Sequence, residues 1–135
     1  MPHITANGTG IEYEEFGSKF GTPFLLISGY GGQMINWSQE FVDGLVDEGF
    51  RVIRFDNRDI GLSQHFDELG IPDMKKIFGG LKDGTAKDHA PYLLEDMAAD
   101  AAGLLEALDA KPAIVMGVSM GGMITQLLAL NHPDA

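Results

Sequence analysis

The feature that most limits the possible folds is a set of three short, mainly apolar segments at residues 23–28, 51–56 and 113–117. Segments of this kind are typical of strands in a parallel sheet whose two faces are both covered by helices. The intervening sequence provides two such helices, because residues 37–48 and 94–108 place apolar side chains along one stripe at helical spacing. This alternation of strand and helix patterns predicts an α/β fold.

The two ends of the sequence add further elements. Residues 3–7 and 11–16 have strand patterns and flank Gly8-Thr9-Gly10, which indicates a hairpin with its turn at these three residues. A last helix is expected over residues 120–131, where Pro133 follows and prevents its continuation.

The segment from residue 64 to residue 92 has no clear period. It combines mixed charge with glycines and prolines, and it predicts an irregular excursion with one short helix around residues 74–78. No internal repeat or low-complexity stretch is present.

Composition narrows the possible partners. The net charge of -11 would repel nucleic acid and anionic lipid surfaces. The lack of cysteine excludes disulfides and thiolate chemistry, and it is compatible with a reducing cytosol. No segment has the length and apolarity of a signal peptide or a membrane span. We therefore expect a cytoplasmic protein with no nucleic-acid partner and no membrane association.

The segment Gly117-Val118-Ser119-Met120-Gly121-Gly122 is the strongest candidate for catalysis. A serine hydroxyl attacks a carbonyl carbon only when it is exposed, deprotonated by a base and faced by donors for the oxyanion. A sharp turn from strand to helix provides the exposure, and Gly117 and Gly121 avoid collisions with neighbouring backbone. In a chain with 18 glycines the pattern alone is weak. Its position between an apolar strand and an amphipathic helix favours Ser119 as the nucleophile, at positive φ.

The loop Ser28-Gly29-Tyr30-Gly31-Gly32 follows another apolar strand, so it can place a backbone N–H above the same edge of the sheet. Glycines after a strand also serve ordinary tight turns. Because the mechanism needs two donors, one of them outside the elbow, the N–H groups of Tyr30 and Met120 are the predicted oxyanion hole.

Together, SGYGG at 28–32, FDNRDIGLS at 55–63 and LLEDMAADAAGLLEALDAKPAIVMGVSMGGMITQLLALNHP at 93–133 resemble the α/β-hydrolases across essentially the whole chain. The last two segments look most like small-molecule esterases of the aclacinomycin methylesterase type. The resemblance implies the N-terminal part of an α/β-hydrolase, with a mostly parallel sheet of strand order 1-2-4-3-5 and helices on both faces. The second strand should be antiparallel to the others, and right-handed crossovers fit this order.

The resemblance assigns the nucleophile to Ser119 and the oxyanion donors to Tyr30 and Met120, for a small-molecule ester substrate and without a cofactor. Asp56, Arg58 and Ser63 match a motif that braces a loop. Ser28 stands where the family commonly has histidine.

The acid and the histidine of the triad are absent, because in this fold both follow the serine on later loops. His132 comes thirteen residues after Ser119, and a helix rising about 1.5 Å per residue would separate them by about 20 Å. We expect His3, His65 and His89 to be ordinary surface or capping histidines. No histidine cluster has the spacing of a metal site, so no metal is predicted.

Two hypotheses remain open. Residues 1–135 are a single but incomplete domain of a serine esterase, inactive alone and completed by a C-terminal half or another polypeptide. Alternatively, the chain is a non-catalytic hydrolase-like module for binding or assembly. In either case the apolar strand at residues 113–117 would lie at a sheet edge, which favours homo-oligomers or pairing with the missing half.

Overall fold

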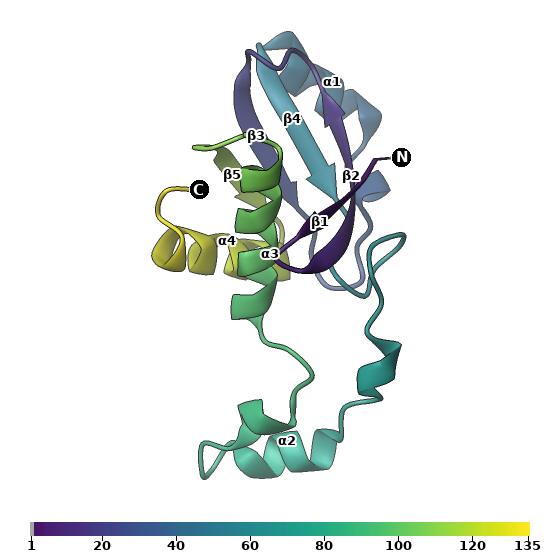
Figure 1. Cartoon of the computed structure of the whole chain (residues 1–135), viewed down its shortest axis with the longest axis vertical. Coiled ribbons are helices and arrows are strands. Elements are labelled where there is room, and N and C mark those ends of the chain that lie inside the picture. Colours follow the sequence, from purple (N-terminus) through teal and green to yellow (C-terminus); the bar gives the residue numbers. More distant parts are fainter. Residues whose placement is uncertain (1) are drawn as a thin grey trace.

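A computed structural model describes residues 2–135 as a sheet flanked by helices, with one segment projecting away from it (Figure 1). The sheet has the order β1-β2-β4-β3-β5. Its strands are β1 (His3–Ala6), β2 (Thr9–Phe16), β3 (Thr22–Ile27), β4 (Phe50–Phe55) and β5 (Ile114–Gly117). β2 runs antiparallel to β1 and β4, whereas β3 runs parallel to β4 and β5. The predicted strand order and directions are therefore confirmed.

The hairpin turn differs from the prediction by one position. Ala6 pairs with Thr9, so the turn consists of Asn7 and Gly8, with φ of 53° and 68°. A two-residue turn of this hand needs positive φ at both central positions, which Asn and Gly tolerate well. The β-branched Thr9 instead begins β2, where its side chain is buried.

The helices cover both faces of the sheet, as predicted. On one face, α1 (Gln39–Asp47) packs Val42 against Leu26 and Val52 of the central strands. On the other face, α3 (Leu94–Ala107) and α4 (Met120–Asn131) enclose the larger hydrophobic cluster. The apolar stripe predicted for α3 is part of that cluster: Met97, Ala101, Leu104, Leu105 and, at its margin, Leu108.

The helix bounds are close to the expected ones. α4 has the predicted bounds, and α3 ends one residue early. α1 starts at Gln39 and not at residue 37, because the hydroxyl of Ser38 accepts a hydrogen bond from the N–H of Phe41 and caps the helix. The preceding residues Met34–Asn36 form a 3₁₀ turn.

The excursion of residues 64–92 extends away from the sheet (Figure 1). It contains α2 (Met74–Gly80), which begins at the predicted position and is two residues longer, between the 3₁₀ turns Asp67–Leu69 and Ala86–His89. Several large apolar side chains are exposed here: Leu69, Ile71, Met74, Phe78 and Leu81. Within residues 2–135, the helices all fall short of the length and apolarity needed to cross a bilayer.

Candidate active site

Ser119 lies at the junction between β5 and α4, and its backbone is unusual. Its φ is 55° and its ψ is -120°, as predicted for a nucleophile elbow. Positive φ costs a non-glycine residue about 1–3 kcal/mol and persists only where the surroundings enforce it. Ser119 is also exposed, so this turn presents its hydroxyl to solvent beyond the end of the strand.

Two of the elbow glycines have no room for a side chain. A Cβ on Gly117 would collide with the backbone of the next turn, 2.6 Å from the nitrogen of Gly122. A Cβ on Gly121 would lie 2.8 Å from the carbonyl oxygen of Ser28. By contrast, a Cβ on Gly122 would find its nearest neighbour at 3.6 Å, an ordinary contact. Close packing of α4 against β3 and β5 thus explains the glycines on both sides of Ser119, and it places no such demand on Gly122.

The loop after β3 packs directly against the elbow. A Cβ on Gly29 would lie 2.9 Å from the carbonyl oxygen of Val118 and 3.8 Å from the nitrogen of Met120. Gly31 has φ of 71°, and the N–H of Gly32 closes the loop by donating to the carbonyl of Gly29 at 3.1 Å. The loop therefore places Tyr30 next to the elbow, as the glycine pattern suggested.

The N–H groups of Tyr30 and Met120 are available to a ligand. Within residues 2–135, neither group donates to another atom of the protein. Both residues line one cleft, of about 760 Å³, between the elbow and the base of the excursion. Two unpaired backbone donors on residues that line one cleft are suited to bind an oxyanion.

The segment 55–63 holds this loop in place, consistent with the bracing role expected for Asp56. The Asp56 carboxylate accepts from the N–H of Met34 at 2.8 Å and from the N–H of Leu62 at 3.0 Å. The amide of Asn57 donates to the carbonyl of Ser28 at 3.0 Å. These bonds connect the loops after β3 and β4, so the position of Tyr30 depends on a buried network.

The side chains of Ser28 and Ser63 are structural. Ser28 Oγ accepts a hydrogen bond from the indole of Trp37 at 3.2 Å. Ser63 Oγ donates to the carbonyl of Asp56 and accepts from the N–H of Glu12 at 2.9 Å. Serine at position 28 therefore ties the loop to Trp37, two residues before α1 begins.

Arg58 forms the most buried ion pair at the cleft. Its guanidinium donates two hydrogen bonds to Asp100 of α3, both 2.7 Å long, and both residues are buried. The guanidinium also lies 4.8 Å from the ring centroids of Phe66 and Tyr92, at the two ends of the excursion. Desolvation opposes the charged form, but the hydrogen bond and charge of Asp100 outweigh it and raise the pKa of Arg58.

The hydroxyl of Tyr92, which lines the same cleft, has a strongly raised pKa. Burial raises the pKa of Tyr92 above its usual range, and a hydrogen bond of 2.5 Å from its O–H to Asp59 adds to the shift. Tyr92 therefore stays protonated at neutral pH and serves as a hydrogen-bond donor.

The histidines do not complete a triad within the part of the chain that the structure describes. No hydrogen bond joins Ser119 to a histidine there. His3 pairs with Glu12 at 3.2 Å, and the ring of His65 bonds the carbonyl of Gly61 at 2.9 Å. His132 caps the far end of α4, and His89 lies in the excursion, where it is exposed.

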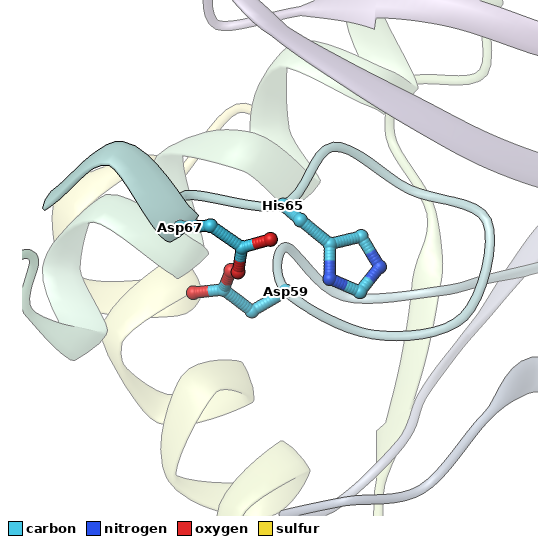
Figure 2. Close-up of side chains that lie close together, drawn as sticks. All are labelled: Asp59, His65 and Asp67. Atoms are coloured by element: carbon cyan, nitrogen blue, oxygen red, sulfur yellow. The ribbon is translucent and has the colours of Figure 1, made fainter. Parts of the chain in front are cut away.

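One arrangement was not anticipated from the sequence. Asp59, His65 and Asp67 place one potential ligand atom each within 4.8 Å of one another, and Figure 2 shows these side chains facing a common space. Their spacing matches no familiar metal motif. Only the turn between Asp59 and His65 brings them together.

Comparison with known proteins identifies the architecture. The model of the alpha/beta hydrolase fold family matches residues 22–135. Rhodomycin D methylesterase DauP of Streptomyces sp. (strain C5) is 33% identical over 97% of this chain. A non-heme chloroperoxidase of Streptomyces lividans is 30% identical over 87% of it. The crystal structure of the enol-lactonase from Burkholderia xenovorans LB400 superposes on 98% of the chain with a TM-score of 0.74 and 27% identity.

The chain is much shorter than these proteins. It spans 38% of the methylesterase, 34% of the chloroperoxidase and 43% of the lactonase. The similarity to α/β-hydrolases and to small-molecule methylesterases that the motifs indicated is confirmed, for the part of those proteins that this chain spans.

Proposed function

This chain belongs to the α/β-hydrolase fold family, and we propose that it carries the nucleophile and oxyanion hole of a serine hydrolase that acts on carboxylic esters of small molecules. One observation carries the proposal: the exposed Ser119 has φ of 55° beside the unpaired N–H groups of Tyr30 and Met120. Relatives named as a methylesterase and an enol-lactonase support an ester bond as the target.

In the proposed reaction Ser119 Oγ attacks the ester carbonyl carbon while a base takes the hydroxyl proton. The carbonyl oxygen becomes an oxyanion, and the N–H groups of Tyr30 and Met120 stabilise it. Expulsion of the alcohol leaves an acyl-enzyme, which water then hydrolyses. Oxyanion donors of this kind contribute about 10²–10³-fold to the rate.

The base and its acid partner belong, in this proposal, to sequence outside the 135 residues. No histidine of the described residues forms a hydrogen bond with Ser119, and an unassisted serine remains protonated at neutral pH. We therefore expect the 135-residue chain alone to show no ester turnover that depends on Ser119. The alternative is a hydrolase-like module that binds or assembles without catalysis.

Labelling with a fluorophosphonate probe tests the nucleophile, because the probe reacts covalently with activated serines. We expect labelling once a C-terminal half of a related hydrolase is added, and its loss in Ser119→Ala. Ser18→Ala is the matched control, since Ser18 is exposed and distant in sequence from the elbow. Equal labelling of wild type and Ser119→Ala would refute the assignment.

Hydrolysis of p-nitrophenyl esters separates the two hypotheses. Turnover only in the mixture supports the esterase whose base comes from outside the chain. Robust turnover by the chain alone, lost in Ser119→Ala, would contradict its predicted inactivity and point to His65, His89 or a second subunit as the source of the base. Binding of esters without turnover under any condition would favour the non-catalytic module.

The exposed edge of β5 supports the proposal that another polypeptide pairs with this chain. Ile114 is 45% exposed and Met116 is 42% exposed, although both belong to an apolar strand. An open strand edge with apolar side chains favours pairing with another chain. We propose that a second copy or the C-terminal half pairs here. A monomer at high micromolar concentration by analytical ultracentrifugation, unchanged when the half is added, would contradict this.

The domain assignment stays part of the same proposal. Both hydrophobic clusters pack on one sheet, which supports a single unit over residues 1–135. A single unfolding transition seen by both fluorescence and circular dichroism would agree with this, and two separate transitions would not.

A further inference from the structure

A cluster of metal-ligating side chains lies at the base of the excursion, apart from Ser119. Asp59 belongs to the loop after β4, and His65 and Asp67 come where the excursion begins. All three line the cleft, and their potential ligand atoms lie within 4.8 Å of one another. Figure 2 shows the carboxylates of Asp59 and Asp67 next to one edge of the His65 ring.

The hydrogen bond to the outer side of the ring fixes the tautomer of His65. Its Nε2 lies 2.9 Å from the carbonyl oxygen of Gly61, and a carbonyl can only accept. Nε2 therefore carries the hydrogen, and in the neutral ring Nδ1 presents a lone pair. Figure 2 shows Nδ1, the ring nitrogen bonded to Cγ, on the side of the ring that faces the carboxylates. A backbone carbonyl that orients one ring nitrogen while the other binds is the usual arrangement around a metal.

Asp59 is also oriented from outside the cluster. The N–H of Phe66 donates to one carboxylate oxygen at 2.6 Å, and the hydroxyl of Tyr92 donates to the other at 2.5 Å. Each oxygen retains a further lone pair for a cation. Asp67 is exposed, so its carboxylate can rotate toward an ion.

The charges in this space favour a cation. Two carboxylates and an imidazole lone pair face one another, and the nearby guanidinium of Arg58 is already paired with Asp100. Electron-rich atoms at this distance repel one another, and a positive charge between them relieves the repulsion. Ligands on opposite sides of one zinc ion, each at about 2.0–2.2 Å, are at most about 4.4 Å apart, so binding requires the exposed side chains of His65 and Asp67 to move closer to Asp59.

We propose that Asp59, His65 and Asp67 bind one divalent transition-metal ion at the cleft. The imidazole favours Zn²⁺ or Co²⁺ over Mg²⁺ and Ca²⁺, which prefer sites made of oxygen ligands alone. The site is independent of the proposed chemistry of Ser119, because none of its three ligands belongs to the elbow or the oxyanion loop.

Calorimetric titration of the untagged 135-residue chain with zinc chloride tests the site. We expect one ion per chain, and at least about tenfold weaker binding in His65→Ala and in Asp67→Asn. His89→Ala and Asp88→Asn are matched controls, because both residues are exposed and lie in the same excursion. These two variants should bind zinc as the wild type does.

NMR spectra of the imidazole ¹⁵N nuclei show which ring nitrogen binds zinc, which a change in zinc affinity alone does not reveal. Zinc should shift Nδ1 of one histidine, and that signal should be missing in His65→Ala. Equal zinc affinity of wild type and His65→Ala would overturn the proposal, as would a shift confined to Nε2. Binding of methylammonium without binding of Zn²⁺ would also overturn it, and would assign the cluster to organic cations.

Discussion

The elbow and the excursion border the same cleft but are held in different ways. The elbow is fixed by backbone packed on backbone, since Gly121 lies against the end of β3 and Gly117 against the first turn of α4. The excursion of residues 64–92 projects from the sheet and leaves large apolar side chains exposed. Its two ends meet at the rings of Phe66 and Tyr92, whose centroids are 5.8 Å apart.

The two regions differ in how precisely they position the groups that border the cleft. A nucleophile must be positioned closely relative to its oxyanion donors, and only the rigid sheet provides such positioning. The excursion forms the opposite wall of the cleft, where variation in sequence and shape is tolerated. Both rings at its base contact Arg58, which is paired with Asp100, and this buried ion pair is one of the attachments of the excursion to the core.

The largest expected effect comes from breaking that attachment. Arg58→Met leaves Asp100 buried without a counter-charge, although the amide of Asn7 still donates to it, and loss of one member of a buried ion pair costs about 3–5 kcal/mol. Urea unfolding should show this loss in the free energy of unfolding. Lys111→Met removes an exposed pair with Asp134 and should have no measurable effect. Equal effects of the two variants would mean that Arg58 does not anchor the excursion.

The elbow glycines should give the next largest difference. Gly121→Ala forces a methyl group against the backbone at the end of β3, and overpacking of this kind costs about 1–3 kcal/mol. Gly122→Ala has space and gains helix propensity, so it should be neutral or stabilising by up to about 1 kcal/mol. Thermal denaturation of the two variants compares them directly. A stable Gly121→Ala would show that the packing at the elbow is loose.

Tyr92→Phe should have a smaller effect, and one that depends on pH. Loss of the hydrogen bond to Asp59 costs about 1 kcal/mol at neutral pH. The folded state holds the pKa of Tyr92 above the ordinary value of 10.0, so this contribution is complete below pH 10. As the pH rises above 10, tyrosine ionises in the unfolded state, and the wild type loses stability. The difference between wild type and Tyr92→Phe should narrow over that range in denaturant titrations, and a constant difference would contradict it.

The smallest effect is expected on the outer surface of the excursion. Ile71 is 97% exposed, and substitutions at such positions change stability by no more than about 0.5 kcal/mol. Ile71→Ser should therefore unfold like the wild type in urea. A large loss of stability would show that the excursion packs against another surface in solution.

Much of the fold was predictable from local patterns. The apolar segments became β3, β4 and β5, and the amphipathic stretches became α1 and α3 on opposite faces of the sheet. Periodicity encodes these elements directly, and right-handed crossovers restrict their order. The predicted hairpin turn was misplaced by one residue. The sequence Gly8-Thr9-Gly10 looked as suitable for a turn as Asn7-Gly8, and only the pairing of Ala6 with Thr9 defines the register.

The sequence by itself determined the elbow, since Ser119 and its flanking glycines are neighbours in the chain and the strand and helix around them follow from periodicity. Only the tertiary structure decided which polar groups meet across the cleft. Arg58 and Asp100 are 42 residues apart, and Tyr92 reaches Asp59 over 33 residues. The cluster of Asp59, His65 and Asp67 depends on how one turn folds back. Such contacts are set by the packing of whole elements, which no local pattern of residues encodes.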